Sequence, residues 1–350
     1  MKRTLACLLA CILTLSVLAG CGPKQGGQSS SDPTSSAPGT SAPGASSSQP
    51  TGEAGIRLTV LSGPTGIGAA KLLADNAAAN QPRYTADVVA ANDEVTAALI
   101  KGETDIAAVA TNVAANLAAK TDGAVQVLAV NTLGVLYILE KGSSVHTISD
   151  LRGKTLYAPS SGQGTNPEYV LNYLLVQNDI DPADVNIQWL TVQEITTKMS
   201  TGSGGICMLP VPAASAVLLS DSQVRQAISL SDEWDKLEQG SLPMGCVVAR
   251  TDFIQENPQA VADFLSDYQA SIAYMSDPAN LDEAAQLVAQ FEITANQAVA
   301  AKAIPQCNLT YLSGDEMKQV LEEYYQILFL ANPASIGGSM PYDSFYYGVG

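Results

Sequence analysis

The chain has 350 residues, of which 46% are hydrophobic and 15% are charged, so it contains enough apolar material to bury one large core or two ordinary ones. Acidic residues outnumber basic residues 34 to 17, and the resulting net charge of −17 repels the phosphates of nucleic acids and of anionic lipid headgroups. The composition therefore excludes a disordered chain and argues against nucleic acid as a partner. After residue 18, no stretch reaches the ~20 apolar residues that a membrane-spanning helix needs.

The first 21 residues have the pattern of a secretory signal. Lys2 and Arg3 precede the mostly apolar run 5–18, and two small residues then precede Cys21. The sequence Leu-Ala-Gly-Cys at this place resembles the lipobox of bacterial lipoproteins. The resemblance implies that residues 1–20 are removed and that Cys21 is acylated, for example with palmitate, which would anchor the protein to the outer face of a bacterial cell membrane. The alternative is a plain signal peptide with a chance cysteine.

Residues 21–54 are predicted to form a flexible linker. From Gly22 to Ala54 the chain consists almost entirely of Ser, Gly, Pro, Thr, Ala and Gln, which offer little apolar surface to bury. A random coil of about 33 residues has an r.m.s. reach of roughly 30 Å. Such a linker would hold a folded domain clear of the membrane.

From residue 55 to about residue 140, strand patterns alternate with helix patterns. The predicted strands are 56–61, 84–90, 105–110, 125–130 and 134–139. The predicted helices are 67–76, 94–101 and 112–120, the first of them after a Ser-Gly-Pro-Thr-Gly turn. This alternation predicts an α/β sheet in which most strands are parallel.

A second α/β series follows residues 140–144. Its predicted strands are 154–158, 185–191, 205–209, 224–230 and 244–249. A helix is expected after the polar loop 160–165, with Asn166 as its N-cap and Pro167 at its first position. The remainder is predicted to be helical, with helices that begin at Asn257-Pro258 and Gly314-Asp315 and bury apolar stripes of three- and four-residue spacing.

Several motifs together resemble the solute-binding lipoproteins of ABC importers that serve nitrate, sulfonates, taurine and thiamine-precursor pyrimidines. The motifs occupy 101–107, 150–155, 209–212, 249–258 and 337–347. The resemblance implies a type II periplasmic-binding fold, in which two α/β lobes joined by two crossovers hold a solute between them, with the C-terminal helices on lobe one. Glycine-containing segments near 140–144 and 239–241 are the expected crossovers. Lobe one would then comprise 55–140 plus 243–350, and lobe two 144–239.

The expected ligand site lies beyond the carboxyl ends of the strands, where loops meet helix N-termini. Loops 62–66, 110–112, 160–166 and 209–212 occupy such places. The candidate ligand-binding residues are Ser62, Gly63, Thr65, Thr111, Asn112, Ser161, Gly162, Gln163, Thr165 and Pro210, with Asn131 and Thr132 as further candidates. None of these loops contains Lys or Arg, so either an anion held by N–H groups or a neutral planar ligand would fit. Helix capping is the alternative role of each hydroxyl.

Catalytic and metal-binding patterns are weak in this sequence. His146 is the only histidine, which leaves neither a Ser-His-Asp set nor a zinc set. Cys207, Cys246 and Cys307 are expected to be small core residues, although a Cys207–Cys246 bridge is conceivable. The helix-start acids Asp93-Glu94 and Glu168 are interpreted as favourable partners of helix dipoles rather than catalytic groups.

The sequence thus predicts a monomeric receptor without a cofactor. It would close its lobes on a small solute, for example a sulfonate, a nitrate-like anion or a pyrimidine, and deliver that solute to the permease subunits of an ABC transporter. It would perform no chemical transformation. The alternative is an enzyme on the same fold, similar to the menaquinone-pathway proteins.

Overall fold

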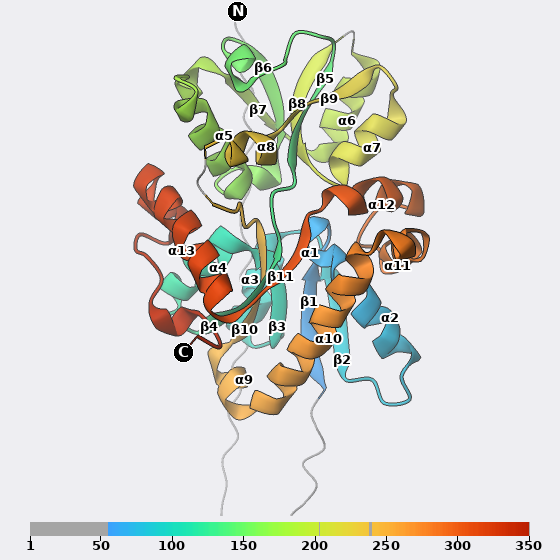
Figure 1. The fold of residues 1–350 in the computed structure, drawn as a ribbon, viewed down its shortest axis with the longest axis vertical. Coiled ribbons are helices and arrows are strands. Elements are labelled where there is room, and N and C mark those ends of the chain that lie inside the picture. Colours follow the sequence, from blue (N-terminus) through green and yellow to red (C-terminus); the bar gives the residue numbers. More distant parts are fainter. Residues whose placement is uncertain (1–54, 203, 238–239, 350) are drawn as a thin grey trace, which may run out of the picture. The chain divides into compact units, whose positions relative to one another are not determined.

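A six-stranded sheet forms the centre of lobe one in the computed structural model, which describes residues 55–202, 204–237 and 240–349 (Figure 1). The expected signal segment, Cys21 and the linker 21–54 lie outside the described residues. The strand order is β11-β4-β10-β3-β1-β2. The strands are β1 (Ile56–Leu61), β2 (Tyr84–Val89), β3 (Ile106–Ala110), β4 (Val125–Thr132), β10 (Gly245–Arg250) and β11 (Leu309–Leu312).

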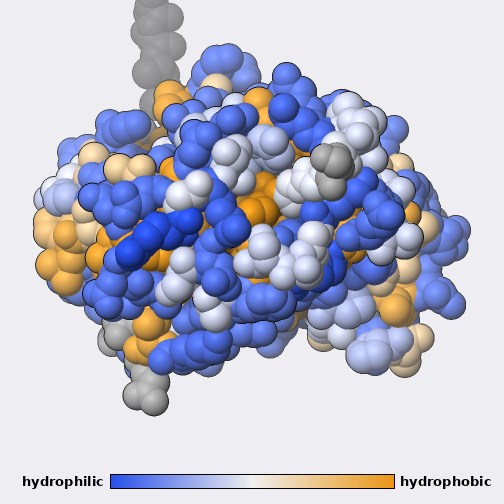
Figure 2. Space-filling view, turned by 90° about the horizontal axis from the view of Figure 1, so that it is seen from above, coloured by the Kyte–Doolittle hydropathy of each residue, from blue (hydrophilic) through white to orange (hydrophobic). Residues whose placement is uncertain are grey.

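A five-stranded sheet with the order β7-β6-β8-β5-β9 forms the centre of lobe two. Its strands are β5 (Leu136–Lys141), β6 (Thr155–Pro159), β7 (Asn186–Leu190), β8 (Gly205–Pro210) and β9 (Val224–Ser229). Both sheets belong to one compact unit of the chain. Seen from the side of lobe two, the surface is mostly hydrophilic and its apolar residues form separate patches (Figure 2).

Helices pack around both sheets (Figure 1). Those of lobe one are α1 (Pro64–Ile67), α2 (Ala70–Ala78), α3 (Asn92–Lys101), α4 (Thr111–Lys120), α9 (Thr251–Glu256), α10 (Pro258–Ser276), α11 (Leu281–Gln290), α12 (Gln297–Ala303) and α13 (Gly314–Ala331). Those of lobe two are α5 (Asn166–Gln177), α6 (Val192–Thr201), α7 (Ala213–Ser220) and α8 (Leu230–Asp235). The predicted apolar stripes of α10 and α13 face the core, where most of their members are buried. Within the described ranges, no helix is both long and apolar enough to cross a membrane.

Most strands of each sheet run in one direction, as predicted, but both sheets are mixed, because β10 and β11 in one sheet and β5 in the other run against the rest. β1 pairs in parallel with β2 and β3, but β10 lies antiparallel between β3 and β4. In the other sheet, β5 likewise runs antiparallel to both β8 and β9. The reason is topological: the chain leaves lobe one at the end of β4 and, after building lobe two, re-enters beside Thr132 at the same end of the sheet, so β10 runs antiparallel to β4.

The first crossing between the lobes lies earlier than expected. Because β5 pairs with β8 and β9, the chain changes sheet at 133–135, and the expected lobe boundary at residue 140 is wrong. Gly134 allows this crossing, since a Cβ there would lie 2.1 Å from Ser231 Oγ. The return crossing runs from the end of α8 to the start of β10, and it includes Gly240 and Ser241 of the expected second crossover.

Two local predictions also need correction. The short strand β11 lies in the region expected to be helical, and it pairs with β4 on the side away from β10. Helix α5 begins at Asn166 with Thr165 as its N-cap, one residue before the expected position. In both cases a tertiary contact decides the outcome, because β4 offers a free edge and Asn166 is held by buried partners described below.

Candidate ligand-binding cleft

A cavity of about 340 Å³ lies where strand ends of the two sheets face each other. Turns after β1 and β2 and the end of β3 supply its lobe-one wall, and the loop after β6 together with Pro210 supplies its lobe-two wall. Residues of the two crossings, including Thr132, Val135 and Met244, complete the lining. The sequence folds in this way because each buried strand ends in a turn that starts a helix, so polar turn residues collect at one edge of each sheet.

The lobe-one wall presents short polar side chains. Ser62 and the buried Thr65 come from the turn between β1 and α1, and Asn92 and Asp93 come from the start of α3. Asn92 Oδ1 accepts a hydrogen bond of 3.1 Å from the backbone N–H of Ala110. This bond ties the turn after β2 to the end of β3 and fixes the wall.

The lobe-two wall is the loop 159–167, whose backbone is folded back on itself. The N–H of Gln163 donates to Ser160 O at 3.2 Å, and the N–H of Thr165 donates to Gly162 O at 3.3 Å. The N–H of Gly164 donates to Glu168 Oε2 at 2.6 Å. These three N–H groups are therefore occupied by the protein's own acceptors, while the side chains of Ser161 and Gln163 are exposed at the cavity.

The floor of the cleft is tightly packed. A Cβ on Gly245 would lie 2.5 Å from Thr65 Cγ2 and 2.7 Å from Asn131 Oδ1, so only glycine fits without movement. Asn131 Nδ2 donates to Thr65 O at 3.0 Å and to Tyr268 OH at 2.8 Å. Thr132 Oγ1 is buried at the lining and has no hydrogen-bond partner. An unpaired buried hydroxyl in a cavity wall is a group that a ligand can satisfy.

Seven of the ten predicted ligand-binding residues line the cavity: Ser62, Thr65, Ser161, Gly162, Gln163, Thr165 and Pro210. Gly63 belongs to the same turn as Ser62 but does not line the cavity. Thr111 and Asn112 are buried in lobe one and do not line it either. Contact with a ligand stays a prediction for all ten residues.

Asn92, Asp93 and Met244 line the cavity as well, although they are not among the predicted ligand-binding residues. The rule that selected the other loops could have found the first two, because β2 also ends in a turn that starts a helix. Met244 borders the cleft only because the return crossing enters lobe one there, and this depends on the tertiary fold.

A buried polar network joins the two lobes beside the cleft. Asn166 of lobe two, 1% exposed, donates from Nδ2 to Thr111 Oγ1 at 2.9 Å and to Met244 O at 3.1 Å. Its Oδ1 accepts from Tyr324 OH at 3.1 Å. Thr111 Oγ1 donates to Pro243 O at 2.8 Å. Burial raises the pKa of the Tyr324 hydroxyl, so this hydroxyl stays protonated and acts as a donor. Thr111 is thus a structural residue that connects the lobes.

The residue types that bind metals do not gather in the part of the chain that the structure describes. No group of three or more His, Cys, Asp or Glu residues is placed there to hold a metal ion. Cys207, Cys246 and Cys307 are free thiols buried in the core, as expected, and they form no bridge. Burial raises the pKa of Cys207 to about 12, so this thiol is not a ready nucleophile.

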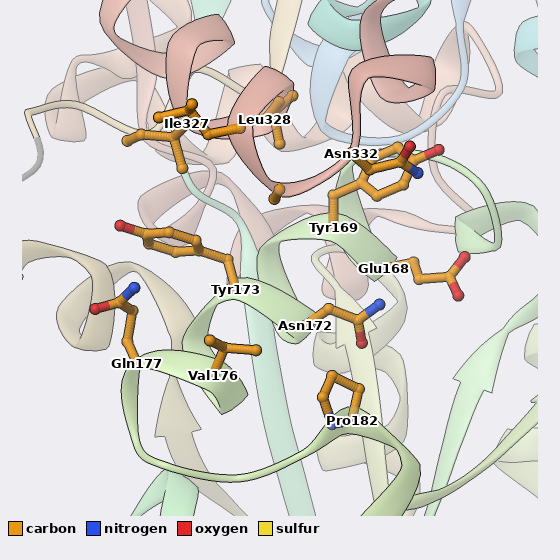
Figure 3. A pocket seen from close by; sticks show the side chains of 12 residues that line it. Glu168, Tyr169, Asn172, Tyr173, Val176, Gln177, Pro182, Ile327, Leu328 and Asn332 are labelled. Carbon is orange, nitrogen blue, oxygen red and sulfur yellow. The ribbon is translucent and has the colours of Figure 1, made fainter.

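A second, larger cavity of about 870 Å³ lies between α5 of lobe two and α13 of lobe one (Figure 3). We call it the α5–α13 groove. Tyr169 and Tyr173 from α5 and Ile327 from α13 project into it, as Figure 3 shows. Among the side chains that line it, Leu330 is 75% exposed. The groove lies away from the strand ends, and its lining is mainly apolar.

Known proteins share parts of this sequence and this architecture. Residues 124–280 match the model of the family described as NMT1/THI5 like. Comparison with curated protein sequences gives no match. A crystal structure of an ABC transporter protein from Parabacteroides distasonis is similar to this chain, with 26% identity, a TM-score of 0.70, and coverage of 83% of this chain and 98% of that one.

Two further solved structures share the fold at lower identity. The periplasmic aliphatic sulphonate binding protein SsuA from Escherichia coli is 16% identical, with a TM-score of 0.65 and coverage of 80% and 93%. The ligand-binding component of an ABC-type import system from Staphylococcus aureus is 15% identical, with a TM-score of 0.62 and coverage of 83% and 95%. The protein therefore has the type II periplasmic-binding fold, and the resemblance inferred from its motifs is confirmed.

Proposed function

We propose that this protein is the extracytoplasmic solute-binding receptor of an ABC importer, and that it binds a small solute in the cleft between its lobes. The observation that carries the proposal is that strand-end turns from both sheets line a single cavity of about 340 Å³. Small-molecule sites lie in such cavities and combine an apolar lining with a few convergent polar groups. The similarity to the Parabacteroides distasonis structure, which is described as that of an ABC transporter, supports a role in a transport system of this kind.

The geometry also explains how binding would be signalled. Ser62 and Thr65 lie on one wall and Ser161 and Gln163 on the other, so a solute that contacts all four favours the conformation in which the walls are close. A ligand shifts such an equilibrium only by its difference in affinity for the two conformations. Contacts with both lobes provide that difference, whereas contacts with one lobe alone do not.

The N-terminal sequence supports the membrane anchor of the proposal: a lipid on Cys21 and the linker 21–54 would hold the protein to the outer face of the cell membrane. The protein would be a monomer, as is expected for a receptor that closes its lobes. It would present the bound solute to the permease subunits of the transporter. Because the cleft lies between the lobes, the permease can distinguish the loaded receptor by its closed conformation.

Thermal unfolding tests the proposal. The full chain, purified in a non-ionic detergent, would be heated with sulfonates, nitrate, bicarbonate, carboxylates, pyrimidines and amino acids in turn. We expect one chemical class to raise the melting temperature, since a ligand at about 100 times its Kd adds roughly 2.7 kcal/mol to the free energy of unfolding.

Hydrogen exchange then tests lobe closure. The solute should protect the backbone of both 62–65 and 160–165 from exchange. A tightly bound solute that protected the loop of one lobe alone would contradict the proposed closure. Conversion of the solute into a product by the purified protein would contradict a pure receptor.

A further inference from the structure

The charge of the cleft lining limits which solutes it accepts. Asp93 is the only charged side chain among the described residues that line the cavity, and Lys, Arg and His are absent from that lining. An oxyanion in this cleft would have no cationic partner. It would depend on backbone N–H groups at helix N-termini, the other common way to bind an anion.

In lobe two, the N-terminus of α5 already has an anionic partner. Glu168, in the first turn of α5, accepts the Gly164 N–H at 2.6 Å. The neighbouring N–H groups of Gln163 and Thr165 donate to carbonyls of their own loop. Before α7, Pro210 and Pro212 have no N–H, and the intervening Val211 N–H donates to Val135 O at 3.1 Å.

Lobe one shows the same pattern. The N–H of Ser62 donates to Val89 O at 2.8 Å, and the N–H of Gly63 donates to Ile293 O at 3.1 Å. The N–H of Thr111, at the start of α4, donates to Met244 O at 3.2 Å. Helix α3 carries Asp93 and Glu94 in its first turn, and these carboxylates oppose the approach of a second anion.

What the cleft does offer is neutral hydrogen bonding. Thr132 belongs to the lining and is only 1% exposed, and its buried Oγ1 has no hydrogen-bond partner. Ser62, Ser161 and Gln163 present neutral polar groups on the two walls. A buried hydroxyl without a partner costs free energy until a ligand group pairs with it.

We infer that the cleft binds uncharged or cationic polar solutes and discriminates against oxyanions such as sulfonates and nitrate. The inference rests on the proposed receptor function and specifies its substrate class. The E. coli neighbour binds aliphatic sulphonates, as its name states, but a shared fold does not determine the ligand. A solute that fits this cleft forms a hydrogen bond with the Thr132 hydroxyl. Its own hydrogen-bond donors face the part of the lining that contains Asp93.

Equilibrium dialysis tests the inference. The full chain in non-ionic detergent is dialysed at physiological ionic strength against a defined mixture of small solutes, matched in shape across three charge classes. Benzoate, benzamide and benzamidine form one such set, nitrate and urea another, and methanesulfonate and dimethyl sulfone a third, beside pyrimidines, amino acids and polyols. Mass spectrometry, with ion chromatography for the small inorganic anions, then quantifies which solutes the protein retains.

The possible results separate the inference from the proposed function. Retention of uncharged or cationic solutes that is reduced in Gln163→Ala supports both. Retention of anions that is reduced in the same variant overturns the inference and leaves the receptor function standing. Retention of no solute, by a protein that melts cooperatively, overturns the receptor function and the inference with it.

A pair of charge variants tests the physical cause. Glu168→Gln removes the negative charge beside the Gly164 N–H and leaves a neutral acceptor in its place, so methanesulfonate or nitrate should bind this variant roughly five- to tenfold more tightly than the natural protein. Glu316→Gln makes the same change in charge in the first turn of α13, on an exposed residue that does not line the cleft, and should leave anion binding unchanged. Equal gains in the two variants, or tight anion binding by the unmodified chain, would overturn the inference.

Discussion

The cleft and the α5–α13 groove are both bounded by the two lobes, yet they differ in size and in chemistry. The groove, at about 870 Å³, is more than twice as large as the cleft of about 340 Å³. The groove is lined mainly by side chains of two helices (Figure 3). The cleft instead collects turns from the ends of several strands. Volume alone therefore does not identify a binding site. Convergent polar groups on a rigid frame are a better indication of one.

Two asparagines of α5, Asn166 and Asn172, provide the strongest contrast between these regions. Asn166→Ala removes bonds to Thr111 and Met244 and leaves Tyr324 OH buried without its acceptor, so we expect a loss of about 3 kcal/mol in the free energy of unfolding. Asn172→Ala is the matched control on the groove side, because Asn172 Oδ1 is buried there without a partner. The Asn172→Ala substitution should lower the free energy of unfolding by less than ~1 kcal/mol. Urea denaturation measures both values.

Equal losses in the two asparagine variants would contradict the view that the network beside the cleft holds the lobes together. A Tyr324→Phe variant sharpens the test. It removes the donor to Asn166 but keeps the ring that packs on Trp234 with 5.8 Å between ring centroids. Its effect should be smaller than that of Asn166→Ala, because Asn166 keeps its bonds to lobe one through Nδ2.

The floor of the cleft gives the next largest effect. Gly245→Ala forces a Cβ against Thr65 and Asn131, and we expect a loss of about 2 kcal/mol in stability together with weaker solute binding, since Thr65 lines the cavity. Thermal unfolding with and without a bound solute measures both effects. If the variant kept natural stability and natural affinity, the floor would be softer than its packing indicates.

A smaller effect is expected from polar side chains that contact the solute without supporting the fold. Gln163→Ala, in the cleft, should weaken solute binding by roughly three- to tenfold with little change in stability, because one neutral hydrogen bond contributes about 1 kcal/mol. Gln177→Ala is its control in the α5–α13 groove and should leave the affinity unchanged. Isothermal titration with a retained solute compares the two. A loss in Gln177→Ala alone would move the binding site to the groove.

Much of this arrangement could be predicted from the sequence, because local patterns determine it. The strands β1, β6 and β8 are short apolar runs followed by turn residues, and these patterns located seven of the ten residues at the cleft. The crossing at 133–135 was placed too late, because an apolar strand carries no mark of the sheet it joins. Thr111 lies against Asn166 rather than at the cavity lining, and the sequence does not reveal this, because a residue that starts a helix at a strand end looks the same whether it faces a cavity or a buried asparagine of the other lobe.

The smallest predicted effect concerns the exposed apolar side chains of the groove. Leu330→Ser removes an apolar side chain that is already 75% exposed, so the free energy of unfolding should change by less than ~0.5 kcal/mol. Solute affinity should also stay the same, since the strand-end cleft does not include Leu330. Thermal unfolding and titration of this variant beside Gln163→Ala measure both quantities under one condition. A fall in affinity would show that the groove senses the solute, and the division of roles between the two cavities would then be wrong.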